Sequence, residues 1–565
     1  MLIQASIQAL QSHVPLNEQQ IEDLLEIPPN ANMGDIAFPC FQLSKMLKKS
    51  PVQIAQELAK QVTSSEIQAE AAGPYVNLRF NRYYFSEQIL EELSTKGWSV
   101  PNLGQGDRVV IDMSSPNIAK PFGIGHLRST IIGAALYKMY QLTGYEVISV
   151  NHIGDWGTQF GKQITAFKRW GDEKALQDDP IAESLKLYVR FHEEAEQDAS
   201  LDPEARDWFR KLEAGDEEAV RLWTYFVQVS MEEFNRMYER LNIQFDYTLG
   251  ESFYNDKMGA VVESLQNKGL LEESDGALVV RLDEQGMPPC LILKKDGTTI
   301  YPTRDLATAF YRHDVMKADR ILYVVGKEQT LHFEQVFAVL KKMEAAWVEK
   351  CTHVGFGLMK FEGKKMSTRR GKIVVLEDVL DEAAARALQT IEDKNTELEN
   401  KQEVAEAIGL GAIIFGDLKN NRTNEVDFSL EEALNFDGET GPYVQYTYAR
   451  TQSILSKHAA SGYQEDIKQC EQEESELLGD SGWELLKILT RYAEQLVRGV
   501  QKNEPSVLAR YVVEVAQAFN KYYNKERILT ENMKLREARL ALTQLTGEIL
   551  STILHILGLQ TPERM

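Results

Sequence analysis

The sequence contains no long apolar run. No stretch approaches the roughly 18 to 20 consecutive apolar residues that a membrane-crossing helix needs. The first residues, MLIQASIQALQSHV, lack the basic start, apolar centre and small-residue cleavage site of a secretory signal. We therefore expect a cytoplasmic protein with no membrane partner.

Cysteine is also scarce. The four cysteines lie far apart, and none forms a C-x-x-C pair or lies near a cluster of histidines. Such pairs and clusters are the usual ligands of structural zinc. We expect reduced thiols and no protein-bound metal.

Positive charge is in short supply. The chain has 62 Lys and Arg against 85 Asp and Glu, which gives a formal net charge of -23. A protein that coats nucleic acid nonspecifically neutralises phosphates with Lys and Arg, so this balance argues against that class. RNA binding is still open, because a local basic strip can lie on an acidic body.

The length and composition are those of a multi-domain globular protein. The chain has 565 residues, of which 43% are hydrophobic and 26% charged, with no internal repeat. We predict a small α+β domain at residues 1–103 and an α/β domain at 104–375. A helical insertion at about 162–285 interrupts the α/β domain. A connecting helical segment at 376–440 and an all-α domain at 441–565 follow.

A β-α-β unit opens the α/β domain. A short apolar run at 108–112 precedes a helix at about 125–142, and a second apolar strand follows at 146–150. This order predicts a Rossmann-type parallel sheet, which binds ligands at the carboxyl ends of its strands.

The same rhythm resumes after the insertion. We expect strands at 291–293, 320–325 and 354–359, with helices at 305–315 and 328–343 between them.

The first informative motif is Ser-Ser-Pro-Asn-Ile-Ala-Lys-Pro-Phe-Gly-Ile-Gly-His-Leu-Arg-Ser-Thr, at residues 114–130. Gly123, Gly125 and His126 lie where a loop turns into a helix. Glycines allow a nucleotide to approach the backbone, and a helix N-terminus attracts phosphate. His126 can then donate a hydrogen bond to a phosphate oxygen. Taken alone, the pattern also fits an ordinary helix start with a structural histidine.

The second motif is Gly-Lys-Lys-Met-Ser-Thr-Arg-Arg-Gly-Lys, at residues 363–372. Five of the nine residues from Lys364 to Lys372 are cationic. Such a loop suits the polyphosphate of ATP, although a solvated basic turn would look the same.

Together the two motifs resemble the HIGH and KMSKS signatures of class I aminoacyl-tRNA synthetases, and Ser-Ser-Pro-Asn-Ile-Ala-Lys-Pro resembles the arginyl-tRNA synthetases in particular. The resemblance covers nearly the whole chain. It also includes residues 73–77, 151–157, 301–307 and 438–446. It implies ATP-dependent attachment of L-arginine to tRNA(Arg) through an arginyl-adenylate, with release of AMP and pyrophosphate.

The chain departs from both signatures. Gly123 replaces the first histidine of HIGH, and Thr368 replaces the first lysine after the serine of KMSKS. His126 and Lys365 remain, and the resemblance implies that Lys120 supplies compensating charge. How the two losses are compensated is open at this point.

The arginine side chain needs a particular kind of pocket. Its guanidinium is a planar, permanent cation with five N–H donors, so acceptors and at least one carboxylate must face it. Asp112 and Asp305 suit this role, although by its spacing Asp305 could serve only as a helix N-cap. The resemblance implies that Tyr301 joins these two carboxylates and that Asn117 and Gln329 hold the other polar end of the amino acid.

The resemblance also implies the sites for ATP. The predicted contacts are Ser114, Pro116, Gly123, Gly125, His126, Met359, Lys365, Met366 and Ser367. Catalysis needs no protein nucleophile, because positioning and charge stabilisation by His126, Lys120, Lys365 and an Mg²⁺ carried by ATP are sufficient.

The remaining predictions concern tRNA. Unstacked RNA bases stack on aromatic side chains, and the all-α domain contains many tyrosines, most of which should be core. The resemblance to an anticodon-binding domain favours Tyr443, Tyr446 and Tyr523, and it favours Asn77 and Phe80 of the N-terminal domain for the tRNA elbow. We expect a monomer. A nucleotidyltransferase acting on a small molecule and a noncatalytic tRNA-binding relative are the alternatives.

Overall fold

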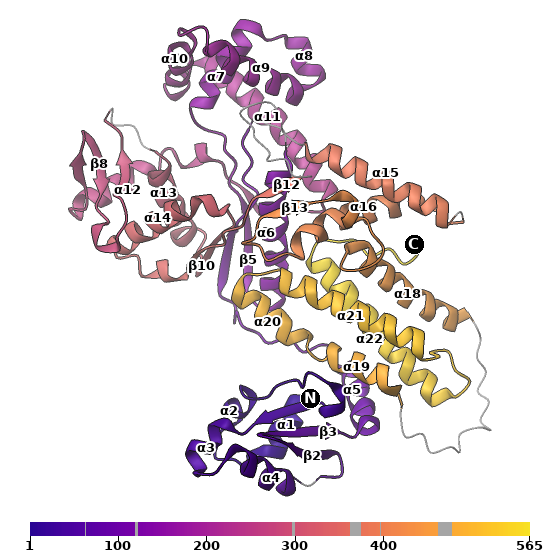
Figure 1. The fold of residues 1–565 in the computed structure, drawn as a ribbon. Coiled ribbons are helices and arrows are strands. Elements are labelled where there is room, and N and C mark those ends of the chain that lie inside the picture. The colour runs from indigo at the N-terminus through magenta and orange to yellow at the C-terminus, as the bar shows by residue number, and fades with distance from the viewer. Residues whose placement is uncertain (63, 119–121, 296–299, 362–374, 396, 461–476) are drawn as a thin grey trace. The chain divides into compact units, whose positions relative to one another are not determined.

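The computed structural model describes residues 1–62, 64–118, 122–295, 300–361, 375–395, 397–460 and 477–565 (Figure 1). The chain divides into two compact units. The first comprises Met1–Ser99, Arg450–Ala493 and Glu514–Leu550, and the second comprises Val100–Ala449, Glu494–Val513 and Ser551–Met565. Among the described residues, no helix is both long and apolar enough to cross a membrane.

The N-terminal part of the first unit is a three-stranded antiparallel sheet with helices. The strand order is β1-β3-β2, and β3 spans Tyr75–Phe80. The other elements are α1 (Leu2–Gln11), α2 (Glu18–Glu22), β1 (Ile36–Pro39), α3 (Phe41–Leu47), α4 (Pro51–Gln61), β2 (Ile67–Ala72) and α5 (Arg82–Lys96). The predicted α+β domain is therefore present.

A buried carboxylate connects this sheet with helix α19 (Gly479–Leu489) of the same unit. Asp35 accepts hydrogen bonds from the backbone N of Phe80 at 3.0 Å, from Trp483 Nε1 at 2.8 Å and from Lys487 Nζ at 2.9 Å. A buried charge is tolerated only when it is paired and hydrogen-bonded, and these three donors meet that requirement.

The second unit contains the predicted parallel sheet, with strand order β11-β10-β4-β5-β6. Its strands are β4 (Arg108–Asp112), β5 (Glu146–Asn151), β6 (Tyr247–Thr248), β10 (Arg320–Tyr323) and β11 (Cys351–His353), and all adjacent pairs are parallel. Helix α6 (Ile124–Leu142) connects β4 with β5. The Rossmann-type prediction is confirmed.

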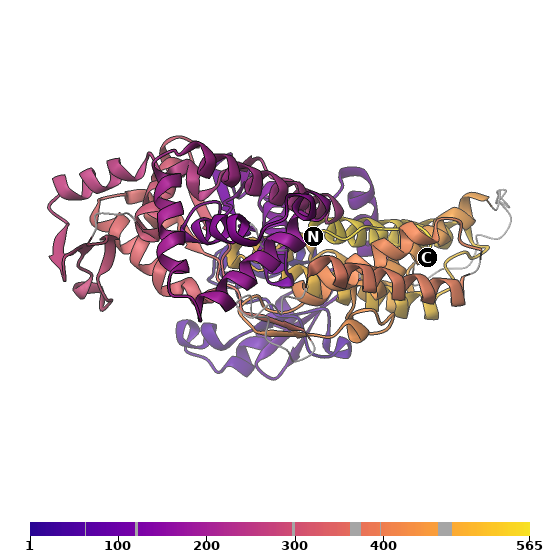
Figure 2. The same cartoon turned by 90° about the horizontal axis from the view of Figure 1, so that it is seen from above.

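Most of the predicted insertion is a cluster of helices, which both views show packed together (Figures 1 and 2). These are α7 (Thr158–Trp170), α8 (Glu173–Asp178), α9 (Pro180–Ala195), α10 (Leu201–Glu213) and α11 (Glu217–Arg240). The chain then returns to the sheet at β6, inside the range that we had assigned to the insertion. A two-residue strand is too short to give a periodic signal.

The strand expected at residues 291–293 does not join the parallel sheet. It is β9 (Cys290–Leu293), which pairs antiparallel with β8 (Ala277–Val280) in a separate sheet completed by β7 (Glu272–Ser274). That expectation was wrong, because a short apolar run does not reveal which sheet it enters. Helix α12 (Met258–Asn267) precedes this sheet.

The rest of the second unit follows the α/β rhythm and then becomes mainly helical. Its elements include α13 (Tyr301–Asp314), α14 (Thr330–Lys342), β12 (Met359–Phe361), α15 (Leu376–Lys394), α16 (Lys401–Leu418), β13 (Val426–Phe428) and α17 (Leu430–Ala433). The last part of the chain, divided between the two units, is helical as predicted: α18 (Gly441–Ala460), α19, α20 (Tyr492–Lys502), α21 (Ser506–Lys525) and α22 (Met533–Ile556).

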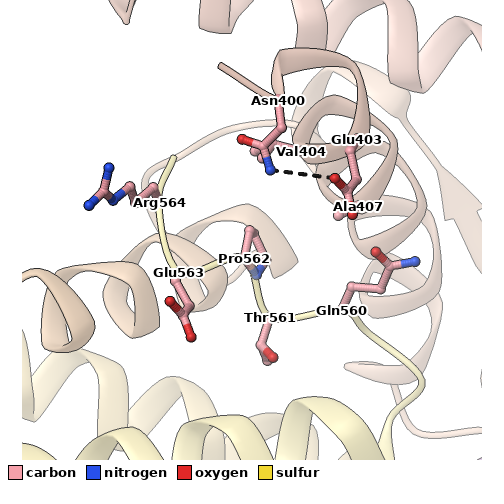
Figure 3. Close-up of a pocket in the computed structure, with 9 residues that line it drawn as sticks. All are labelled: Asn400, Glu403, Val404, Ala407, Gln560, Thr561, Pro562, Glu563 and Arg564. Carbon is pink, nitrogen blue, oxygen red and sulfur yellow. Dashed lines mark hydrogen bonds between the residues drawn. The ribbon is translucent and has the colours of Figure 1, made fainter. Parts of the chain in front are cut away.

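The C-terminal tail of the second unit lies along α16 (Figure 3). Gln445 Nε2 donates to the backbone O of Gln560 at 2.9 Å, and Asn395 Nδ2 donates to the backbone O of Met565 at 3.2 Å. A cavity of about 370 Å³ lies between the tail and α16, and none of the predicted site residues lines it. The site has to be sought at the parallel sheet.

Candidate active site

The loop after β4 has an unusual backbone. Ser114 and Ser115 have φ angles of 72° and 54°, a left-handed conformation that non-glycine residues rarely adopt. Ser114 Oγ lies 2.7 Å from Tyr238 Oη and accepts from Thr130 Oγ1 at 2.8 Å, while the backbone N of Ser115 donates to Asn151 Oδ1 at 3.1 Å. These contacts hold the loop in a conformation that would otherwise cost of order 1–3 kcal/mol per residue.

The next residues of the loop are fixed against the end of β5. The backbone N of Gly154 donates to the O of Pro116 at 2.9 Å, and the N of Ile118 donates to the O of Gly154 at 3.2 Å. A Cβ at Gly154 would lie 2.6 Å from Asn117 Oδ1, so only glycine leaves room for the asparagine. Asn117 is therefore half-buried and held at the carboxyl edge of the sheet.

His126 lies in the first turn of α6. Its Nδ1 accepts a hydrogen bond from the backbone N of Gly123 at 3.2 Å, and its ring centroid is 5.4 Å from that of Phe122. Because Nδ1 accepts, a neutral ring carries its proton on Nε2, and that tautomer can donate to a phosphate oxygen. Gly125 is exposed, and a Cβ built on it meets no described atom within 4 Å. The helix start therefore has open space of the kind that a nucleotide needs.

Asp112 ends β4 and is 6% exposed. Its Oδ2 accepts from Arg312 Nη2 at 2.7 Å, and its Oδ1 accepts from Ser115 Oγ at 3.0 Å. A guanidinium of the chain itself thus lies against the carboxylate that we predicted for a substrate guanidinium. Direct contact between Asp112 and the substrate stays a prediction.

Helix α13 begins at Tyr301, with Ile300 as its N-cap. The alternative role of Asp305 as an N-cap is therefore wrong, because Asp305 is already within the helix. Its Oδ2 lies 2.5 Å from His332 Nε2 on α14, and its side chain is 24% exposed. Tyr301 is 59% exposed, and Gln329 is exposed just before α14.

Glu251 is a further candidate for the site, and no sequence motif pointed to it. It begins the 3-10 helix η2 (Glu251–Tyr254), and its Oε2 accepts from Arg304 Nη1 at 3.0 Å. Burial raises the pKa of Glu251 to about 7; Arg304 opposes this rise, and Asp305 and Asp155 add to it. Arg304 alone does not offset the cost of ionising the buried Glu251. A second cation bound nearby would therefore stabilise the carboxylate form.

The buried ring of His152 shows that the acidic residues form one cluster. It interacts electrostatically with Asp112, Arg312, Asp305 and Asp155, and burial lowers its pKa. Residues from β4, α13 and the segment after β5 are therefore brought together at the carboxyl edge of the sheet. This is the place where α/β folds bind their ligands.

Family models match the chain from end to end. The model for the N-terminal domain of arginyl-tRNA synthetases matches residues 1–80, and the catalytic-domain model "tRNA synthetases class I (R)" matches 88–430. The DALR anticodon binding domain matches 444–565.

Curated relatives are similar over almost their whole length. The arginine–tRNA ligase of Clostridium perfringens is 48% identical over 560 residues, covering 98% of each chain. Arginine–tRNA ligase 1 of Bacillus cereus is 50% identical over 553 residues, covering 97% of each. The chain belongs to the arginyl-tRNA synthetase family.

A solved structure agrees with this family assignment. The arginyl-tRNA synthetase of Thermus thermophilus superimposes with a TM-score of 0.80 at 28% identity, covering 100% of this chain and 99% of that one.

Several residues predicted for ATP lie in or beside the segments that the structure leaves out. Lys120, Lys365, Met366 and Ser367 are outside the described residues. Met359 is buried in β12. After the second signature, Val375 pairs with Gly123, and the N of Leu376 donates to the O of Phe122 at 3.0 Å. The residues that follow the KMSKS-like motif therefore lie beside the residues at which the HIGH-like motif begins.

The residues predicted for tRNA have different exposures. Tyr446 and Tyr523 are 40% and 41% exposed, and Tyr443 is half-buried. Asn77 and Phe80 lie on β3, the central strand of its sheet, and are 7% and 3% exposed. The described surface thus offers Tyr446 and Tyr523 for stacking on bases, and all five roles stay predictions.

Proposed function

We propose that this chain activates L-arginine with ATP and transfers the arginyl group to tRNA(Arg), releasing pyrophosphate and AMP. The arginine carboxylate attacks the α-phosphorus of ATP and displaces pyrophosphate. The ribose hydroxyl of the terminal adenosine of the tRNA then attacks the arginyl carbonyl and displaces AMP. The proposal rests on the family to which the chain belongs and on the acidic cluster at the carboxyl edge of the parallel sheet.

In this proposal the carboxylates of Glu251 and Asp305 determine the specificity for arginine. Glu251 already has Arg304, and Asp305 has His332, yet the pKa of Glu251 remains near 7. A planar guanidinium has enough N–H donors to bond to both carboxylates. In this proposal Tyr301 and Asp112 also line the guanidinium site, and Asn117 and Gln329 hold the other polar end of the amino acid. A lysine ammonium is a single point charge and would leave acceptors unpaired.

The ATP-binding part of the proposal uses the start of α6. His126 donates to a phosphate oxygen, Gly123 and Gly125 let the nucleotide approach, and Ser114 and Pro116 shape the loop. Lys120 and Lys365 supply positive charge, while Met359, Met366 and Ser367 complete the site. In this proposal Mg²⁺ arrives with the phosphates of ATP, whose charge it offsets.

The tRNA-binding part assigns the two terminal domains. Residues 1–103 bind the tRNA elbow, and residues 441–565 read the anticodon with Tyr443, Tyr446 and Tyr523. In the sequence these domains flank the catalytic part 104–375 and its connecting segment 376–440. We also propose that the chain acts as a cytoplasmic monomer, and light scattering with and without tRNA tests its oligomeric state.

An ATP–pyrophosphate exchange assay over the twenty amino acids, with and without tRNA(Arg), tests the function. Of the twenty amino acids, only arginine should support exchange. The tRNA(Arg) should then accept the arginyl group. An absence of exchange with every amino acid, combined with tight tRNA binding, would instead favour the noncatalytic relative.

Gly125→Ala should raise the KM for ATP by about tenfold or more, because the new methyl group lies where the nucleotide approaches. The thermal midpoint should hardly change, since the added Cβ meets no described atom within 4 Å. Gly259→Ala on α12 is the matched control: its Cβ also meets no described atom, and it lies outside the proposed site. Equal KM values for the two variants would remove Gly125 from the ATP site.

The KM for arginine should fall about tenfold between pH 6 and pH 8, because Glu251 must lose its proton to pair with a guanidinium and its pKa is about 7. The raised pKa keeps the group largely protonated at pH 6, so binding improves as pH rises and levels off above pH 8. Steady-state exchange rates measured across this range provide the test. Glu251→Gln should flatten the profile, and an unchanged profile in that variant would assign the titration to another group.

A further inference from the structure

Helix α13 connects the arginine pocket with the end of β4. Asp305 is near its start, and Arg312 follows seven residues later, about two helical turns along. Arg312 has a side-chain exposure of 0%, and its Nη2 donates to Asp112 Oδ2 at 2.7 Å. The helix that carries the pocket is therefore bonded directly to the last residue of β4.

The contact continues from Asp112 into the ATP loop. The other oxygen of Asp112 accepts from Ser115 Oγ at 3.0 Å, and Ser115 is one of the two left-handed serines. From this loop the chain proceeds to α6 and His126. Two hydrogen bonds thus join α13 to the loop that precedes the first signature.

Stability alone does not explain the buried ion pair between Arg312 and Asp112. Among the described residues, Arg312 Nε and Nη1 are buried and meet no acceptor with good hydrogen-bond geometry. The guanidinium does interact with two buried tyrosines: Tyr254 lies close to it, and the ring centroid of Tyr323 is 5.1 Å away. A buried ion pair with unmet donors is often no more stable than apolar side chains of the same volume. A role of the ion pair in fixing the position of α13 relative to β4 explains it better.

We propose that Arg312 is a positioning residue for the activation step: by holding Asp112, and through it Ser115, it sets the arginine pocket on α13 at the correct distance from the ATP loop. This inference rests on the proposed function. In-line attack needs the carboxylate oxygen about 3 to 3.5 Å from phosphorus, and a misplacement of about 1 Å can cost about 10²-fold in rate. Arg312 touches neither substrate in this arrangement and acts only through Asp112.

The test compares Arg312→Met with Arg312→Lys in the full-length protein, using ATP–pyrophosphate exchange with arginine and tRNA(Arg). Arg312→Met should lower kcat by about 10²-fold, with both KM values changed by less than about threefold. Arg312→Lys should recover about tenfold of that loss, because one donor is enough for the single bond to Asp112. Arg386→Met is the control, since Arg386 is 49% exposed in an i,i+4 pair with Glu382 on α15, and its kcat should match that of the wild type.

Other outcomes decide against the inference. A rise in the KM for arginine with normal kcat would assign Arg312 to substrate binding, and equal losses in the Lys and Met variants would exclude positioning through Asp112. If Arg312→Met fails to fold, Ser115→Ala cuts the same connection at its other end: a lowered kcat at normal thermal midpoint supports the inference, and a normal kcat overturns it. If the wild-type protein showed no exchange, that result would contradict the proposed function and not the role of Arg312.

Discussion

Replacing His126 by alanine should lower the rate of arginine-dependent ATP–pyrophosphate exchange by about 10² to 10³, the usual cost of removing a donor that stabilises charge developing in a transition state. The structure gives a reason for this role. Nδ1 accepts from the backbone N of Gly123, so the neutral ring has its proton on Nε2 at the start of α6. With Gly123 in place of the first histidine of the signature, the described part of this helix start contains no second imidazole.

The His126→Ala experiment needs a control for the fold. The side chain is half-buried and contacts Phe122, so the thermal midpoint and the KM for arginine should be measured in parallel. Both should stay near their wild-type values if the ring acts mainly on the transition state. An exchange rate within about threefold of the wild type would show that other groups stabilise the negative charge on the phosphate in the transition state.

The parts of the fold that the sequence predicted are those with local, periodic signals. Strand β4 has the predicted bounds, and helix α6 begins one residue before its predicted start. Helix α6 is long enough for its apolar period to be recognised, whereas β4 is a short apolar run that was found from its place before that helix. The place of His126 in the first turn of α6 was predicted for a similar reason, because it depends on a local pattern, and its role in catalysis stays a prediction.

The groups that the sequence could not predict depend on contacts between distant segments. Asp112 and Arg312 are separated by 200 positions, and nothing near either residue announces the other. Glu251 follows a strand of only two residues and lies inside the range 162–285 that the sequence assigns to the insertion, so no pattern connects it with the site. The left-handed backbone at Ser114 was equally hidden, since it depends on Tyr238 and Thr130.

Asp305→Asn should lower kcat/KM for arginine by about 10² to 10³, the cost of leaving a desolvated cation without its charged partner. The amide has nearly the same size as the carboxylate and can still hydrogen-bond His332, so the position of α14 should be kept. The KM for ATP should stay unchanged, because Asp305 belongs to α13 and the nucleotide site that we propose is at the start of α6. Exchange kinetics with varied arginine and varied ATP separate the two effects.

The same helix provides a matched control. Asp314 Oδ1 lies 2.7 Å from His313 Nδ1 in an Asp–His pair at the other end of α13, where the Asp314 side chain is 60% exposed. Asp314→Asn should leave kcat/KM near the wild-type value, because an exposed pair contributes little. Citrulline, a neutral analogue with the planar shape of arginine, gives a second comparison: Asp305→Asn should narrow the preference for arginine over citrulline. If that preference were unchanged while kcat fell, Asp305 would be aligning the helix and not recognising the charge.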